Sequence, residues 1–304
     1  RGRANALRSA MSGRISMDAL TNERLYEVLD LCLECKGCKA ECPSNVDMSK
    51  LKHEFLAQYS DNHGISLRNR LFGNLPTVSR LGSLFAPISN WTLRSGIVKG
   101  VLSQLIGLEK NRDLPLFSTQ TFSQWFNIRE KPFTSLAKRG EVVLFVDTFT
   151  NYNYPELGQS AIKILESMGY EVILPNNQCC GRPMLSNGML DKARANATAN
   201  VEILFPYVDR GAKIVGIEPS CLLSFRDDYL SLLGDDKKTK AVSDSVMLFE
   251  EFYLDSLQDG WPGLDFVEDV GKVLLHGHCH QKAIVGTEPA IKVLDTMPGC
   301  DVEE

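Results

Sequence analysis

The sequence lacks the features of a membrane-spanning, secreted or nucleic-acid-binding protein. The most apolar stretch, Leu81 to Leu108, is interrupted by Arg94 and Lys99, so no run of about 18 uncharged apolar residues predicts a transmembrane helix. The first residues have no apolar core of the kind that a secretion signal needs. The net charge of −5 leaves no basic surplus for nucleic acid. We therefore expect a cytoplasmic protein, either free or peripheral on the inner face of the cell membrane.

Two further absences concern cofactors and completeness. The sequence has no G-x-G-x-x-G motif, the glycine-rich turn of dinucleotide sites, so we expect no flavin site within it. It starts at Arg1 without a methionine and stops at Glu304 without a capping or tail signal. We expect the chain to be a piece of a longer polypeptide.

Cysteine is present in an odd number, nine, and is strongly clustered. An odd count without a secretion signal argues against a disulfide framework. Reduced thiols that act as ligands are the better interpretation. Cys300 lies near the end of the sequence and is assigned no role.

The segment CLECKGCKAECP holds four thiols with the spacing C-x2-C-x2-C-x3-C-P, those of Cys32, Cys35, Cys38 and Cys42. This spacing is typical of a ferredoxin-type [4Fe–4S] site, because a tight loop carries thiolates to several irons of one cluster. A zinc knuckle or unrelated thiols are the alternatives. Pro43 restricts Cys42 to extended backbone, and in two-cluster ferredoxins the fourth cysteine ligates the other cluster. Cys42 therefore either completes the local cluster or binds a partner cluster whose motif lies before Arg1.

The pattern along the chain predicts an α+β, multi-domain fold. Residues 1–60 are expected to be helical around the cysteine loop, with a helix over DMSKLKHEFLAQY capped by Asp47 or Ser49. Residues 61–140 alternate short apolar segments with Gly, Pro, Asn and Ser, and we interpret them as a helical connector. Residues 141–304 alternate strands with helices, which indicates βαβ units and a parallel sheet. The four predicted strands are EVVLFVD, YEVILP, AKIVGIEP and GKVLLHG.

Cysteines follow three of these strands. Cys179 and Cys180 follow the second strand, Cys221 the third and Cys279 the fourth. Because sites gather at the carboxyl ends of parallel strands, we expect these thiols to converge, and helix N-termini behind them would lower their pKa. A buried structural cysteine is the alternative for any single one. Among three nearby histidines, His280 is preferred as a contact of this site over the other two, His276 and His278.

Four segments carry a resemblance to a known family: CLECKGCKAECPSNVDMSKLK, NNQCCGRPMLSNG, IEPSCLLSFRDDYL and HGHCHQKAIVGT. Over essentially its whole length, the chain resembles the C-terminal iron–sulfur half of bacterial FAD-linked oxidoreductases of the D-lactate and D-2-hydroxyglutarate dehydrogenase type. It is also similar to the iron–sulfur subunits of glycolate oxidase and of anaerobic glycerol-3-phosphate dehydrogenase, and to the CCG-containing subunit of heterodisulfide reductase.

The resemblance implies a domain order and a set of cofactors. It implies a ferredoxin-type segment that is the second motif of a pair (1–60), a connector (61–140) and a cysteine-rich CCG domain (141–304) truncated before its second repeat. It implies a [4Fe–4S] cluster in the first of these and FAD in a flavin domain that is missing here or is a separate subunit. Electrons would pass from reduced FAD to an external acceptor such as a quinone or another redox protein.

The sequence departs from the full CCG repeat of heterodisulfide reductase-like proteins at two places. The first strand runs into DTFTNY without a cysteine, and Glu218 replaces one thiol of a C-x-x-C pair. A noncubane cluster is therefore not expected. A single metal ion, with tetrahedral zinc as a candidate, and a cubane-type cluster both stay open for this second site. Its predicted ligands are Cys179, Cys180, Cys221, Cys279 and His280.

Three functions follow from these observations. The first is the electron-transfer segment of a flavin-dependent D-2-hydroxyacid dehydrogenase. Its cofactors would carry the redox chemistry, so no residue is assigned as catalytic and the chain alone should not turn over a hydroxy acid. The second is a separate iron–sulfur subunit of a glycolate oxidase, an anaerobic glycerol-3-phosphate dehydrogenase or a heterodisulfide reductase-like complex. The third is a zinc-binding interaction module.

Overall fold

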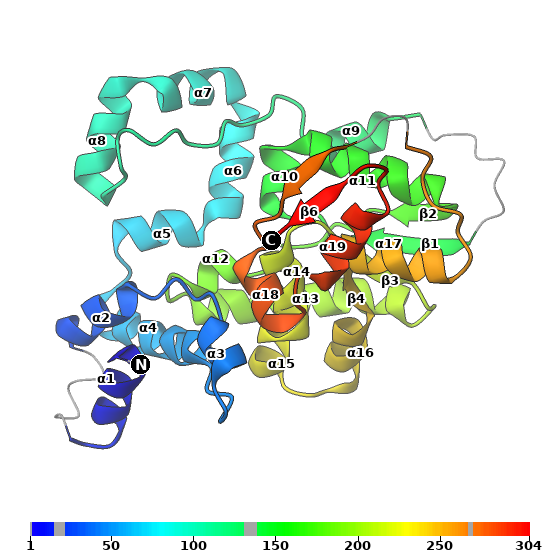
Figure 1. Cartoon of the computed structure of the whole chain (residues 1–304). Helices are drawn as coiled ribbons and strands as arrows, with labels where there is room; N and C mark the ends of the chain where they lie inside the picture. Colours follow the sequence, from blue (N-terminus) through cyan, green and yellow to red (C-terminus); the bar gives the residue numbers. More distant parts are fainter. Residues whose placement is uncertain (1, 15–21, 131–138, 267–269) are drawn as a thin grey trace.

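The computed structural model describes residues 2–14, 22–130, 139–266 and 270–304 (Figure 1). Its N-terminal part has helices around the cysteine loop: α1 (Gly2–Met11), α2 (Glu23–Asp30), α3 (Gly37–Glu41) and α4 (Met48–His63). The carboxylate of Asp47 accepts hydrogen bonds from the backbone N–H groups of Ser49 and Lys50, so Asp47 is the cap of α4. Leu29 and Phe55 are buried in a small apolar core between these helices.

The segment predicted to be a helical connector contains helices, with a non-helical stretch over residues 107–121. Its helices are α5 (Leu67–Gly73), α6 (Leu75–Leu84), α7 (Ala86–Arg94), α8 (Gly96–Ile106) and α9 (Phe122–Ile128). Figure 1 shows α7 and α8 at one edge of the molecule, away from the sheet. None of the helices in the described residues is long and apolar enough to cross a membrane.

The main sheet is parallel and has the strand order β2–β1–β3–β4. Its strands are β1 (Gly140–Leu144), β2 (Tyr170–Ile173), β3 (Lys213–Gly216) and β4 (Val246–Leu248). Alternate side chains point to opposite faces of a strand. Accordingly, Val143 and Ile214 pack with residues of α13 and α14, whereas Val142 and Val215 pack with residues of α11 and α17. Both faces are buried, as is usual for a parallel sheet.

Helices connect the strands, as the alternating pattern predicted. They are α10 (Thr148–Tyr152), α11 (Pro155–Ser167), α12 (Arg182–Leu185), α13 (Leu190–Val208), α14 (Pro219–Arg226), α15 (Asp228–Leu233), α16 (Lys237–Ser245) and α17 (Phe249–Gln258). Towards the C-terminus follow α18 (Cys279–Ile284) and α19 (Glu288–Asp295). The chain is thus a helix-rich α/β protein with a small parallel sheet.

The fourth predicted strand forms, but it lies outside the main sheet. GKVLLHG supplies β5 (Lys272–Leu274), which pairs with β6 (Asp301–Glu303) in a separate two-stranded parallel sheet. The place beside β3 belongs to β4, a segment that none of the four predicted strands includes. Val246 and Leu248 are buried and stand in register with Ile214 and Gly216. A three-residue strand that runs directly into a helix gives no separate periodicity, so the pattern alone could not divide the two.

Candidate metal centre

The cysteine loop exposes thiols and buries charged side chains. Cys35 and Cys38 are exposed, whereas the neighbouring Glu34 and Lys36 are 3% and 2% exposed. Glu34 and Lys36 both have left-handed backbone, with φ of 56° and 60°. That conformation costs energy for residues other than glycine and persists only where the surroundings impose it. The contacts of these two side chains therefore determine the shape of the loop.

Cys42 follows α3 in extended backbone, with φ of −82° and ψ of 120°, as expected for a residue before proline. The backbone N–H groups of Val46, Ser44 and Asn45 donate to its sulfur and hold the pKa of the thiol below its usual value. Stabilising the thiolate in this way suits Cys42 to ligate a metal.

The thiols of this loop fit an iron–sulfur cluster in their chemistry. All four are free: Cys32, Cys35, Cys38 and Cys42. In the described part of the chain, no group of three or more His, Cys, Asp or Glu side chains is arranged to hold a single metal ion. Zinc needs its ligands around one atom, whereas a cluster takes thiolates on separate irons. The C-x2-C-x2-C-x3-C-P spacing favours a cluster over zinc at this loop.

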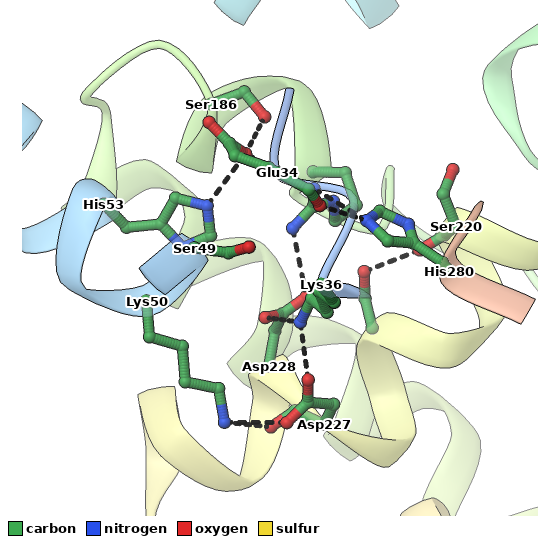
Figure 2. Close-up of polar contacts among 12 residues, drawn as sticks. Glu34, Lys36, Ser49, Lys50, His53, Ser186, Ser220, Asp227, Asp228 and His280 are labelled. Carbon is green, nitrogen blue, oxygen red and sulfur yellow. Dashed lines mark hydrogen bonds and ion pairs between the residues drawn. The ribbon is translucent and has the colours of Figure 1, made fainter. Parts of the chain in front are cut away.

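Lys36 ties the cysteine loop to the sheet domain (Figure 2). Its Nζ donates to Asp227 Oδ2 at 2.5 Å and to Asp228 Oδ1 at 2.6 Å, and all three side chains are buried. Lys39 and Lys50 also pair with Asp227, with N–O distances of 2.8 and 2.7 Å. Burial raises the pKa of Asp227, but Lys36 and then the other two cations outweigh burial and hold it well below its usual range.

Glu34 anchors the same loop through a second set of contacts. Four side chains lie against its carboxylate, those of Lys52, His53, Arg182 and Ser186. Burial raises the pKa of Glu34, but His53, Arg182 and Lys52 together hold it well below its usual range. Arg182 also contacts Asp228 at 3.3 Å. The anchors of Glu34 and Lys36 therefore belong to one buried ion network.

The backbone of the loop is held by two further donors. Lys52 Nζ donates to the Cys32 carbonyl oxygen at 2.8 Å, and His280 Nε2 lies 2.7 Å from the Glu34 carbonyl oxygen. Burial and the nearby Arg182 lower the pKa of His280 to about 4. The imidazole is therefore neutral at pH 7 and uses its Nε2 proton in this bond. His280, predicted as a contact of the second metal site, is placed against the cysteine loop.

Sequence reasoning missed this network. Charged side chains are rarely buried, so nothing in the composition set Asp227, Asp228 or Arg182 apart. One signal was available in the motif itself. Glu34 and Lys36 stand inside a ligand loop, where side chains that do not bind the metal must pack against something else.

The predicted convergence of thiols in the CCG domain is found for the cysteines that follow β2 and β3. Cys180 Sγ, after β2, lies 3.0 Å from Cys221 Sγ, after β3, and Cys179 hydrogen-bonds Cys180. Gly181 has a φ of 91°, a conformation that glycine adopts without steric cost. The amide of Asn200, fully buried on α13, fixes this loop, because its Oδ1 accepts from the Gln178 N–H at 2.7 Å and its Nδ2 donates to the Cys179 carbonyl at 3.3 Å.

These thiols have raised pKa values. The hydrogen bond with Cys180 and burial raise the pKa of Cys179 well above its usual value. The hydrogen bond with Cys180 lowers the pKa of Cys221, but burial and the carboxylates of Asp147 and Glu218 raise it to about 11. The pKa values of Cys179 and Cys221 are thus raised, whereas the helix N-termini were expected to lower them; the hydrogen bond with Cys180 at Cys179, and burial with nearby carboxylates at Cys221, act in the opposite direction.

Cys279 does not join the other thiols by way of the main sheet. It is exposed and begins α18, and the preceding β5 belongs to the smaller sheet. The neighbouring His278 places its Nε2 3.9 Å from Glu218 Oε1, at the start of α14. The segment thus approaches the CCG site through a histidine rather than through the predicted strand end.

Two clefts adjoin the carboxyl end of the sheet. One, of about 820 Å³, is lined by Cys179 and Asp147 and, from α6, by Arg80 and Ser83. The other, of about 550 Å³, is lined by Asp147 and Glu218. Clefts at this end of a parallel sheet are common binding sites, so small molecules have a path to Cys179.

Comparison with protein families assigns both cysteine regions. Residues 2–47 match a 4Fe-4S dicluster domain, and residues 143–226 match a cysteine-rich domain, CCG. The first match includes all four cysteines of the loop, and the second includes Cys179, Cys180 and Cys221 but ends before Cys279. Both assignments confirm the resemblance read from the sequence.

Among the curated relatives that match the chain are a dehydrogenase subunit, a dehydrogenase and a lactate utilization protein. The chain is 31% identical over 262 residues to a subunit of the anaerobic glycerol-3-phosphate dehydrogenase of Escherichia coli (strain K12), covering 86% of this chain and 65% of that one. It is 25% identical over 247 residues to D-2-hydroxyglutarate dehydrogenase of Pantoea ananatis (strain AJ13355), covering 78% and 24%. It is 32% identical over 169 residues to lactate utilization protein A of an Exiguobacterium species, covering 52% and 64%. The chain thus spans a little under two thirds of the first relative and about a quarter of the second. No solved structure matched it.

Proposed function

We propose that this chain, which carries a 4Fe-4S dicluster segment and a CCG cysteine-rich domain, is the iron–sulfur electron-transfer component of a flavin-dependent dehydrogenase. In this proposal residues 1–60 hold the cluster, residues 141–304 form the CCG domain, and residues 61–140 connect these two parts. The bound cluster would supply one-electron redox chemistry. The observation that carries the proposal is the C-x2-C-x2-C-x3-C-P loop with free thiols, folded against the CCG domain by buried ion pairs.

The roles of the chain's own residues follow from their positions. Cys32, Cys35 and Cys38 would ligate the cluster, and Cys42 would ligate either the same cluster or a partner cluster. The flavin would reside in another domain or subunit, because this sequence has no glycine-rich dinucleotide motif. The acceptor would be a quinone or another redox protein.

Metal analysis and spectroscopy test the proposal directly. Protein purified without oxygen should contain iron and acid-labile sulfide, and reduction with dithionite should give an electron paramagnetic resonance signal of a reduced cluster. Zinc without iron on the four loop cysteines would instead support an interaction module. Without added flavoprotein, the chain should not reduce a dye with D-lactate, D-2-hydroxyglutarate or glycerol 3-phosphate as donor.

Two versions of this function differ in the substrate of the enzyme and in whether the flavin domain is on the same polypeptide. In the first, the chain is a segment of a D-2-hydroxyacid dehydrogenase; in the second, it is a separate polypeptide that assembles with a flavoprotein. Higher identity and greater coverage of a relative named as a subunit favour the second version. Reading the coding sequence upstream distinguishes them, since a flavin domain in the same reading frame belongs only to the first.

The CCG domain is proposed to hold a second metal site. Its proposed ligands are Cys179, Cys180, Cys221, Cys279 and His280. The contact of the Cys180 and Cys221 sulfurs supports this, as does the loop that Asn200 holds in place. Zinc and iron contents of a Cys180→Ser variant test it, because such a site would lose its metal while the metal of the N-terminal loop is retained.

The protein is also proposed to lie in the cytoplasm, on the inner face of the cell membrane. No Asp or Glu occurs from residue 62 to 108, whereas five Lys or Arg do. On α8, Ile97 and Leu105 are 82% and 65% exposed, and Trp91 on α7 is 72% exposed. Apolar and cationic side chains together suit an anionic lipid surface.

Flotation with lipid vesicles tests this location. The protein should float with vesicles that contain phosphatidylglycerol, less so at high salt, and not with pure phosphatidylcholine. The Trp91→Glu/Ile97→Glu variant should stay unbound, whereas Ile128→Glu, a change at a 72% exposed site on α9, should behave as the unmodified protein. Equal flotation of both variants would exclude α7 and α8 as the contact.

A further inference from the structure

The ion network behind the cysteine loop joins the two cysteine regions of the chain. Each CCG-domain segment that carries a cysteine also contributes to it: Arg182 follows Cys180, Asp227 and Asp228 follow α14, and His280 follows Cys279. Figure 2 shows Lys36 directed towards Asp227 and Asp228. The loop therefore cannot change its backbone without disturbing groups next to the CCG thiols.

The buried charges of this network are closely paired. Among the described residues, Lys36, Lys52 and Arg182 contact the buried carboxylates of Glu34, Asp227 and Asp228. Lys39 and Lys50, whose side chains are 26% and 30% exposed, add two cations against Asp227 from the edge of the network. Buried charge usually requires such compensation, so removing one buried member changes the charge next to the cysteine loop.

Two cations lie inside the cluster motif, Lys36 after Cys35 and Lys39 after Cys38, and Lys36 is the buried one of the two. Its Nζ is held by two buried carboxylates, so it cannot swing into solvent when the charge of its surroundings changes. A fixed positive charge near a cluster stabilises the added electron, and a fixed negative charge destabilises it, because net charge sets cluster potentials.

We propose that Lys36, clamped between Asp227 and Asp228, is a positioning residue through which the CCG domain sets the reduction potential of the cluster on the cysteine loop. The proposal rests on the electron-transfer function above. It goes beyond that function by assigning the potential to a cross-domain charge pair rather than to the ligands alone. It also predicts that changes on the CCG side, at Asp228, are felt at the cluster.

A redox titration followed by electron paramagnetic resonance tests the proposal through the sign of the shift. Lys36→Met removes the positive charge, so the midpoint potential should become more negative. Asp228→Asn removes a negative charge, so the potential should become more positive. The Lys36→Met/Asp228→Asn variant should return close to the unmodified value. Lys238→Met serves as control, since Lys238 pairs with Glu202 on the surface of the same domain and should shift nothing.

A purely structural role gives a different pattern. If the network only held the loop in shape, the two single variants would shift the potential in the same direction or lose the cluster alike, and the double variant would not recover; either result overturns the proposal. Should Lys36→Met fail to fold, the charge-balanced double variant and Asp228→Asn still carry the test. Protein without iron and sulfide would refute the electron-transfer function itself, whereas a bound cluster with an unmoved potential would refute only the role of Lys36.

Discussion

The two cysteine regions of this chain hold their thiols by opposite means. In the N-terminal loop, consecutive sequence supplies all four thiols, and buried charges behind the loop hold it in shape. In the CCG domain, separate strands supply thiols that meet at 3.0 Å in buried surroundings, where their pKa values are raised. The first region depends on electrostatics across an interface, and the second depends on the packing of a sheet. Mutations should therefore damage the two regions in different ways.

The largest expected effect is loss of the cluster from the loop. Replacing Cys35 and Cys38 together by Ala removes two exposed thiols, and the protein should lose nearly all iron of this site because a cluster depends on its thiolates. Iron and sulfide assays measure the result. The control is Cys300→Ala, which should keep the full iron content, and iron retained in the double variant would contradict the assignment of this motif.

A smaller effect is expected when the network loses an anion. Glu34→Ala leaves Lys52 without its carboxylate partner and Arg182 with Asp228 alone, and breaking a buried pair in this way costs about 3–5 kcal/mol. Urea unfolding of the apo-protein provides the measurement. Glu202→Ala breaks only the exposed pair with Lys238 and should cost less than about 1 kcal/mol. Similar losses in both variants would mean that burial of the network adds nothing.

Packing of the sheet should govern the CCG region. Ile214 on β3 is fully buried, and Ile214→Ala is expected to lower the free energy of unfolding by about 2–5 kcal/mol because it leaves a cavity. The same change should speed alkylation of the buried Cys180 by a small thiol reagent while Cys35 reacts as before. An equal increase in the reactivity of Cys180 and Cys35 would contradict the view that sheet packing protects only the CCG thiols. Ile97→Ala, at an exposed site, is the matched control.

The smallest expected effect is a difference in acid sensitivity. The pKa of Asp227 is lowered in the folded protein, so the folded state binds fewer protons there than the unfolded state, in which the pKa is about 3.9. The stability that Asp227 contributes is present above this value and is lost as the pH falls below it. The melting temperature of Asp227→Asn should therefore lie below that of the unmodified protein at pH 6, and this gap should shrink towards pH 2. A gap of constant size would argue against ionisation as the cause.

The features that could be predicted from the sequence are the local ones, which depend on neighbouring residues. The spacing of four thiols, the Asp47 cap and the extended backbone before Pro43 are local, and the structure agrees with the two backbone predictions. Periodicity also predicted the strands β1 to β3. These features depend on neighbouring residues and need no knowledge of distant contacts.

The missed features all depend on residues far apart in sequence. The strand β4 forms because β3 offers an open edge, and a three-residue apolar segment carries no pattern that reveals this. The pairing of Lys36 with Asp227 and Asp228 spans about 190 residues, and no local rule anticipates it. The raised pKa of Cys221 likewise reflects burial, which the helix-dipole argument did not include.

The left-handed backbone at Glu34 and Lys36 limits how this protein can be engineered or recombined. A ferredoxin loop transplanted between α2 and α4 would bring its own four cysteines but not these two side chains. Asp227 and Asp228 would then lose Lys36, and Arg182 would lose Glu34, so the graft would be expected to misfold or to stay detached from the sheet. The cluster motif of this chain is therefore not an exchangeable cassette, and its non-cysteine positions can change only together with their partners about 150 to 250 residues further along the chain.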